Sequence, residues 1–404
     1  NFVCSTEMKI IVKTSFLILV IFLLFQLRCE GKSIEEEEEI VKLASHEPDP
    51  LEQLEYGLRD VDFDAVQAER EREKQLEAEL QNELTSIIGV VDESEQVLNE
   101  RLFAWAKVAG IQHQVELGYF KYPYQFDKNS DEVFDVYVRG LKTIRTVQPR
   151  ETLVSAPRKA VLVRETLSRP VRKFLDYTLD VPCQLWHGRT YLTLGIMLET
   201  LFTKWRPYLD HLHSSATQSY PNTPVMWPRE KTLNFYSENV ANIAQAKHNA
   251  LKETFQKVKK RVDALPESIP GVSKHNYDAM RAMLNRLTER IFIREFTLID
   301  SRYWRSRFKH KPGCSAPMLV PIADLANIGE RGPDWVNTFV FFDQLDDTKG
   351  PIDADEGDFY RMVAGRHYLA GDEIVNRYDD DSKETFIIEY GVDKDRTSIP
   401  GPPK

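Results

Sequence analysis

Several residue patterns that mark common enzyme classes are missing from this chain of 404 residues. There is no Walker phosphate-binding loop, no serine in a nucleophile elbow and no HExxH motif. Histidine is also sparse, and no complete set of four ligands stands at zinc spacing. The pairs His211/His213 and His310/Cys314 come nearest to one, and we expect these histidines to be solvated at the surface. P-loop, serine-hydrolase and zinc chemistry are therefore disfavoured, and no metal site is predicted.

Cysteine is scarce too, with 4 residues in the chain. Cys4 and Cys29 lie near the amino terminus, which leaves Cys183 and Cys314 in the body. A disulfide between these two and a pair of reduced buried thiols are both compatible with the sequence.

Long apolar runs are few, and the clearest is Phe16–Phe25, which follows Lys9 and Lys13. Its length is typical of a signal-peptide core and short for a bilayer span. Residues 1–31 are therefore predicted to be a leader with a signal peptide, cleaved near Cys29–Gly31. The body then belongs to the secretory pathway, in the endoplasmic reticulum lumen or secreted. The alternative is an uncleaved signal anchor, which would attach the protein to a membrane.

Basic residues are scarce in one segment. Residues 30–100 contain 23 Asp and Glu against 6 Lys and Arg, whereas the rest of the chain contains 40 and 47. So acidic a segment repels nucleic-acid phosphates, and no nucleic-acid partner is expected. Residues 32–95 are predicted to form an acidic linker and a helix over 63–88, in which Leu80 and Leu84 follow a four-residue spacing. This helix binds a partner or lies on its own domain, and we favour the second interpretation.

Residue periodicity in the body predicts a β-rich region and then a helical one. An amphipathic helix is expected to end near Gly110. Strands are expected over 133–137, 141–147 and 153–158. From about 166 to 300 the pattern is helical, with helices over 190–203, 231–264 and 277–302. The helix over 190–203 is more apolar than a surface helix and is expected to be buried.

Three segments near the carboxy terminus carry a specific order of residues. They are 317–327, 371–378 and 389–392, which read PMLVPIADLAN, GDEIVNRY and EYGV. The first is predicted to be a buried strand that delivers Asp324 and Asn327 to one place. In this order the segments resemble the carboxy-terminal half of a SET domain. Their residues are most similar to those of the Rubisco large-subunit and actin-histidine methyltransferases.

The resemblance implies an α+β fold, in which a β-rich SET domain is split by a mainly helical insertion and preceded by an acidic helical stalk. It implies a SET domain over 100–395, an insertion over about 166–300 and a loose tail over 396–404. It also implies an S-adenosylmethionine-dependent protein methyltransferase that acts on lysine or histidine side chains, with a protein as substrate.

The same resemblance assigns roles to single residues. Tyr378 matches the catalytic tyrosine, and Arg302 matches an arginine that faces the cofactor carboxylate. Asp324 is expected to be structural, bonded to nearby backbone. The residues implied to bind the cofactor are Arg139, Gly140, Leu141, Arg302, Asn327, Ile328 and Tyr390, of which the first three would form a loop whose backbone meets it. Plainer interpretations are a surface arginine, a hairpin glycine, a capping asparagine and core tyrosines.

Departures from the family pattern gather on the cofactor side. Ile328 stands where the relatives have histidine, and Gly140 is alone where they have Gly-x-Gly. Val392 replaces a phenylalanine, which removes on the order of 1 kcal/mol of stacking. Together these changes favour an alternative function, a non-catalytic SET-fold protein of the secretory pathway that binds a partner.

Overall fold

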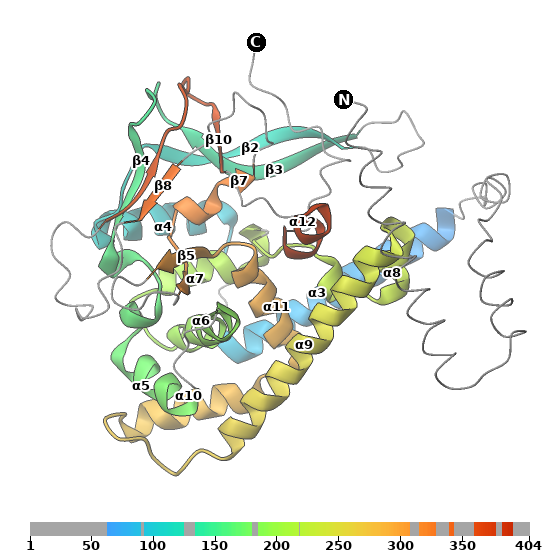
Figure 1. The fold of residues 1–404 in the computed structure, drawn as a ribbon, viewed down its shortest axis with the longest axis vertical. Helices are drawn as coiled ribbons and strands as arrows, with labels where there is room; N and C mark the ends of the chain where they lie inside the picture. Colours follow the sequence, from blue (N-terminus) through green and yellow to red (C-terminus); the bar gives the residue numbers. More distant parts are fainter. Residues whose placement is uncertain are drawn as a thin grey trace, which may run out of the picture. The chain divides into compact units, whose positions relative to one another are not determined.

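The computed structural model describes residues 63–89, 93–124, 134–179, 185–217, 219–307, 315–328, 339–342, 359–376 and 382–390 (Figure 1). The chain divides into two units, residues 1–74 and 75–404. Helix α3 (Phe63–Ile88) begins in the first unit, and all other described elements belong to the second. The predictions about the leader, the linker, the tail, both cysteines and Tyr378 concern residues outside these ranges. No helix within them is long and apolar enough to cross a bilayer.

The strands of the second unit form two four-stranded sheets and a short hairpin. One sheet has the order β1 (Gln112–His113), β4 (Thr152–Pro157), β9 (Phe359–Val363), β8 (Phe339–Phe342). The other has the order β2 (Val115–Tyr124), β3 (Phe134–Thr143), β10 (Glu373–Asn376), β7 (Asn327–Ile328). The hairpin pairs β5 (Trp304–Arg307) with β6 (Ser315–Met318). β7 and β10 run parallel, so segments almost 50 residues apart in sequence lie side by side.

Strand β3 corrects one prediction from the sequence. The loop expected at Arg139–Leu141 is the interior of β3, which pairs with β2 without interruption along its whole length. Gly140 lies opposite Gly118 in this pair. A Cβ at Gly140 would lie 2.5 Å from Nδ2 of Asn327, which is far too close. The glycine is needed for this close approach and not for a turn.

The helical insertion lies between β4 and β5, as predicted. It consists of α5 (Arg169–Thr178), α6 (Leu185–Glu199), α7 (Arg206–His213), α8 (Arg229–Phe235), α9 (Glu238–Asp263), α10 (Lys274–Arg286) and α11 (Glu289–Asp300), with short 3-10 turns between them. The helix predicted over 231–264 is two helices, since Ser237 caps the amino terminus of α9. The helix predicted over 277–302 is also two, because Thr288 caps α11 in the same way.

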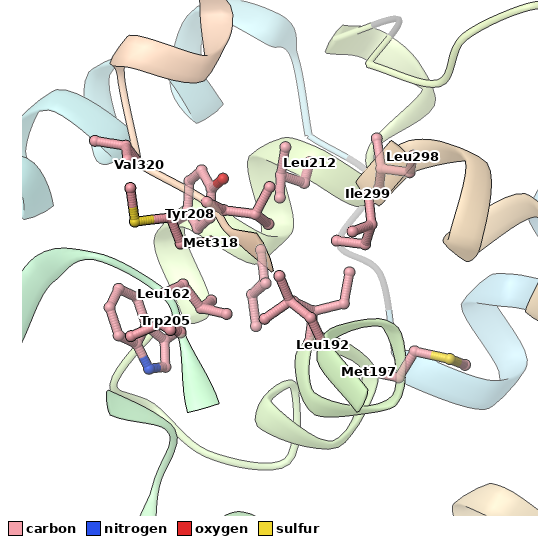
Figure 2. Close-up of a cluster of buried hydrophobic side chains, with 14 of the residues drawn as sticks. Leu162, Leu192, Met197, Trp205, Tyr208, Leu212, Leu298, Ile299, Met318 and Val320 are labelled. Atoms are coloured by element: carbon pink, nitrogen blue, oxygen red, sulfur yellow. The ribbon is translucent and has the colours of Figure 1, made fainter. Parts of the chain in front are cut away.

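The main core lies where α6 and α7 meet α11 and the end of β6 (Figure 2). Leu192 and Met197 of α6 are buried, which confirms the prediction for this helix. Trp205 and Tyr208, at the start of α7, are fully buried in the same core. The run 317–323 is strand only as far as Met318, after which the buried chain turns through η5 (Ala323–Leu325).

The second half of α3, from Gln75 onward, packs on the body of its own unit. Leu80 and Leu84 are buried in the core, whereas Leu76 is exposed. Arg294 of α11 donates hydrogen bonds to Glu77 and Gln81 at 2.8 and 3.1 Å. For this half of the helix, the contacts favour the interpretation that it lies on its own domain. α4 (Glu95–Ala109) follows and ends at Gly110, as predicted.

Candidate functional site

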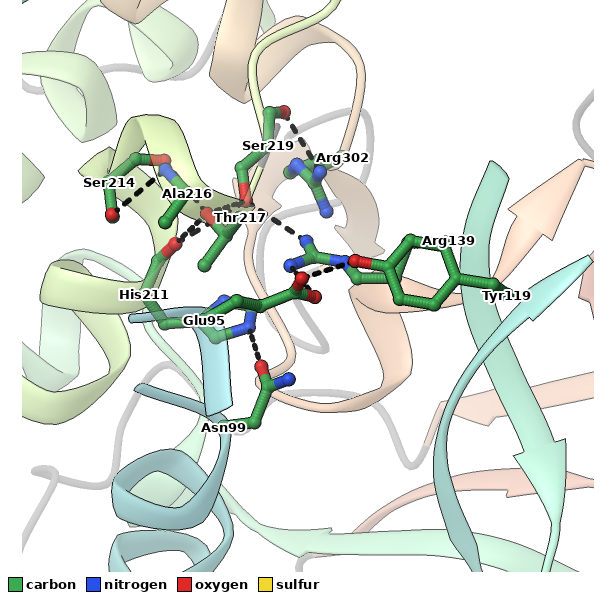
Figure 3. A network of polar contacts seen from close by, with 10 residues as sticks. All are labelled: Glu95, Asn99, Tyr119, Arg139, His211, Ser214, Ala216, Thr217, Ser219 and Arg302. Carbon is green, nitrogen blue, oxygen red and sulfur yellow. Dashed lines mark hydrogen bonds and ion pairs between the residues drawn. The ribbon is translucent and has the colours of Figure 1, made fainter. Parts of the chain in front are cut away.

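Two arginines from distant elements share one serine. Arg302, just after α11, donates from Nη2 to the carbonyl oxygen of Ser219 at 2.9 Å. Arg139 of β3 donates to Oγ of the same serine at 3.2 Å. Arg302 also donates to the carbonyl oxygen of Asp324 at 2.9 Å, and Arg139 pairs with Glu95 of α4 at 3.5 Å. Figure 3 shows both guanidiniums on the same side of Ser219. β3, α4, α11 and η5 thus converge on one polar cluster.

The charges of this cluster and its burial shift the pKa of several of its groups. Burial and the positive charge of Arg302 lower the pKa of Arg139 to about 10, although Glu95 opposes the shift. Burial, followed by the charges of Arg139 and Arg302, lowers the pKa of His211 well below its ordinary value. His211 is therefore neutral at physiological pH and adds no charge to the cluster. Two guanidiniums, those of Arg139 and Arg302, meet two carboxylates, those of Glu95 and Asp324.

His211 and His213 correct the expectation of solvated histidines, because both are almost completely buried. The ring of His211 lies 3.0 Å from Oδ1 of Asn99 through Nε2. Since an amide oxygen only accepts, Nε2 carries the proton and Nδ1 presents a lone pair. His213 contacts the carboxylate of Glu295 at 3.0 Å. Within the described residues no group of histidine, cysteine and acidic side chains could hold a metal ion.

Asp324 is buried beside the arginines. The hydroxyl of Tyr208 donates to its Oδ2 at 2.5 Å, so the carboxylate bonds a side chain and not only nearby backbone. Burial raises the pKa of Asp324 to about 6, and the charge of Arg302 limits the rise. The group is ionised at neutral pH.

Three buried polar atoms of this cluster have no hydrogen-bond partner among the described residues: Nε of Arg302, Nδ1 of His211 and Oδ1 of Asp324. Buried polar atoms in folded proteins are nearly always paired, so such atoms mark a place for water or a ligand. A guanidinium matches a carboxylate, and an ionised carboxyl matches an ammonium group. The residues present therefore fit the amino-acid end of S-adenosylmethionine.

A second cluster lies on the opposite face of β3, because neighbouring residues of a strand point to opposite faces. Nδ2 of Asn327 donates to Oε1 of Glu373 at 2.8 Å. The hydroxyl of Tyr122 donates to the other oxygen of the same carboxylate. Burial raises the pKa of Glu373, although both hydrogen bonds oppose the rise. The amide of Asn327 is thus already engaged by a side chain of β10.

Comparison with known proteins identifies the fold. No family model and no curated protein matches the sequence. Among solved structures, the chain is similar to the SET domain of LSMT bound to lysine and AdoHcy, with a TM-score of 0.51 and 13% identity over 74% of this chain and 58% of that chain. The same comparison finds Rubisco LSMT bound to AdoMet, with a TM-score of 0.49 and 13% identity over 74% and 56% of the two chains. This chain has a SET-domain fold.

The chain therefore covers less than two thirds of the length of these solved proteins. The match confirms the α+β fold with its helical insertion, which the sequence predicted. Arg139 of the first cluster and Tyr122, Asn327 and Glu373 of the second lie on one sheet, which contains the segments around Asn327 and 373–376.

The SET fold brings some of the predicted cofactor residues together. Arg139 joins Arg302 in one cluster, and Gly140 joins Asn327 in the other. Leu141 is completely buried, so its side chain is part of the core. Ile328 follows Asn327 in β7, where its backbone pairs with Asn376. Tyr390 ends α12 (Lys383–Tyr390), with its ring 5.4 Å from that of Phe386. Their cofactor contacts stay predictions.

Sequence reasoning missed several residues of the two clusters. They include Glu95, Tyr122, Tyr208, His211, Ser219 and Glu373. No spacing along the chain links these residues to their partners in the clusters. Glu373 stood inside a segment that the sequence had singled out, whereas His211 was considered only as a metal ligand and expected at the surface.

Proposed function

We propose that the chain is an S-adenosylmethionine-dependent protein methyltransferase that modifies lysine or histidine side chains. The observation that carries the proposal is the pair of neighbouring guanidiniums of Arg139 and Arg302 in a SET fold, with the ionised carboxylate of Asp324 beside it. S-adenosylmethionine, when bound, supplies a methyl group that its sulfonium centre already activates. The protein has to hold donor and acceptor in line and keep water away.

Residues of the first cluster would hold the amino-acid end of the cofactor. Arg302 has an Nε–H to donate to a carboxylate, and the nearby charge of Arg139 strengthens that bond. Asp324 can accept from the ammonium group through its Oδ1, which accepts no hydrogen bond from another described residue. Neutral His211 adds a lone pair without adding charge. Charge and hydrogen-bonding capacity are thus complementary to a zwitterion.

The acceptor amine would be prepared by desolvation, since burial disfavours the ammonium form. Tyr378, which matches the catalytic tyrosine of the family in sequence, would orient the amine through its hydroxyl. A specific observation supports the alternative, a non-catalytic SET-fold binding protein of the secretory pathway. The amide of Asn327 is hydrogen-bonded to Glu373, and Ile328 follows it in place of histidine.

Calorimetric titration with S-adenosylhomocysteine tests the proposal. We expect submillimolar binding by the wild-type protein, and a loss of at least about tenfold in affinity for Arg302→Met, which equals about 1.4 kcal/mol. Arg145→Met is the matched control, because Arg145 is half exposed and pairs with an exposed glutamate. No heat of binding by the wild type up to millimolar ligand would refute the methyltransferase and favour the binding protein. Methyl transfer from a labelled donor to candidate proteins, followed by acid hydrolysis, separates methyllysine from methylhistidine.

A further inference from the structure

Four charged side chains from four helices meet outside the two clusters described above. The ammonium of Lys247 (α9) pairs with Oδ2 of Asp300 (α11) and, at 3.4 Å, with Oε1 of Glu389 (α12). The guanidinium of Arg189 (α6) pairs with the other oxygen of Asp300. The exposed fractions of the four side chains are 11% for Arg189, 12% for Lys247, 1% for Asp300 and 20% for Glu389. We call these residues the charge network.

The charge network is balanced only when it is complete. Two cations face two anions, and a buried ion pair tolerates the loss of one partner poorly because the remaining charge stays desolvated. The rings of Phe296 and Tyr303 lie 5.5 and 5.3 Å from the Arg189 guanidinium and limit its freedom to move away. Loss of Glu389 would leave two cations to share Asp300.

Two residues of the charge network are close in sequence to residues of the predicted cofactor site. Asp300 lies two residues before Arg302 of the candidate site, and Glu389 lies directly before Tyr390. α12 packs against α9 and α11, and its Phe386, Ile387 and Ile388 are buried. The network thus joins the carboxy-terminal end of α11 to the carboxy-terminal end of α12, which are almost 90 residues apart.

We propose that the charge network fixes the end of α12 against α11 and thereby positions Tyr390 relative to Arg302. Lys247 and Glu389 are then positioning residues, since they act on the site through α12. The part of this inference that concerns the cofactor rests on the proposed function.

A double-mutant cycle in the full chain tests the network directly. Hydrogen–deuterium exchange of residues 383–390 is measured for Lys247→Met, Glu389→Gln and the double variant. We expect at least tenfold faster exchange in each single variant and little further change in the double variant, because both substitutions break the same contact. Lys247→Arg keeps the charge and should retain most of the slow exchange. Unchanged exchange in α6 shows that a variant is folded.

The matched control is the pair Lys252–Glu289, which also joins α9 to α11 but is more exposed, at 50% and 32%. Lys252→Met should leave the exchange of 383–390 unchanged. The network would be overturned if residues 383–390 exchanged in Glu389→Gln at the wild-type rate. It would also be overturned if the effects of the two single substitutions added up in the double variant. Glu389→Gln is also expected to weaken S-adenosylhomocysteine binding at least threefold, and an unchanged affinity would overturn the positioning of Tyr390. If the wild type binds no S-adenosylhomocysteine, the proposed function fails while the exchange cycle still decides whether the network fixes α12.

Discussion

The glycine pair of β2 and β3 gives a sharp test of the second cluster. Gly118 and Gly140 lie opposite each other, so alanine at either position meets the same strand geometry. A Cβ at Gly140 would lie 2.5 Å from Nδ2 of Asn327 and 3.1 Å from Oε1 of Glu373. A Cβ at Gly118 would meet Cδ of Lys142 at 2.9 Å. That side chain is flexible and one-third exposed, so it can move aside.

The expected costs of the two substitutions therefore differ. Gly140→Ala forces the Asn327 amide away from Glu373, which loses a buried hydrogen bond of roughly 1–3 kcal/mol. Restricting the unfolded chain returns about 0.4–1 kcal/mol. We expect a net destabilisation of about 1–2 kcal/mol for Gly140→Ala. Gly118→Ala should lie within about 0.5 kcal/mol of the wild type or be slightly stabilising.

Urea unfolding followed by tryptophan fluorescence measures both variants on the same scale. The difference in unfolding free energy between the two variants is the decisive quantity, since strand propensity is common to both. Equal stability of Gly140→Ala and Gly118→Ala would refute the close approach of Asn327 to β3. The arrangement of the second cluster would then be wrong.

Three further predictions follow from buried or sequence-assigned groups. Glu295→Gln should lower the unfolding free energy by about 3–5 kcal/mol in urea unfolding, because this fully buried carboxylate pairs with His213; a loss below 1 kcal/mol would contradict the pairing. Folding raises the pKa of Asp324 from 3.8 to about 6, so its contribution to stability is present below about pH 4 and is lost as pH rises through 6. The loss is about 3 kcal/mol, and Asp324→Asn should flatten this part of the stability–pH curve; an unchanged slope would refute the shift. Tyr378→Phe should abolish methyl transfer in the labelled-donor assay and leave S-adenosylhomocysteine binding intact, and retained turnover would remove Tyr378 from catalysis.

The elements of the fold that were predictable from sequence are those set by local patterns. The helix over 63–88 and the end of α4 at Gly110 follow from apolar spacing and from the left-handed conformation that glycine adopts at a helix end, with φ of 86°. The breaks before α9 and α11 were also visible in principle. Ser237 and Thr288 are capping residues, but the apolar pattern on either side of them reads as one helix.

Residues whose role depends on distant partners could not be interpreted from the sequence. A glycine such as Gly140 is typical of a turn in sequence. The residue whose close approach requires a glycine here, Asn327, lies 187 positions further along the chain. His211 and His213 stand in a polar stretch, and the groups that allow their burial are Asn99 and Glu295, which are 112 and 82 positions away. Their burial follows from tertiary contacts and not from their neighbours in sequence.

Glu295 and Asp324 are both fully buried carboxylates, but their pKa values shift in opposite directions. Burial alone would raise the pKa of Glu295, but His213, Tyr220 and Arg294 outweigh it and lower the pKa, so this charge stabilises the fold above acidic pH. Asp324 accepts a hydrogen bond from Tyr208, but the effect of burial is larger and raises its pKa. Its ionised form therefore destabilises the free protein. A cation bound at Oδ1 of Asp324 would offset that destabilisation. Glu295 requires no such ligand, because its ionised form is already stabilised within the protein. A carboxylate kept ionised at an energetic cost beside two arginines is the arrangement expected of a ligand site, and not of a core built for stability alone.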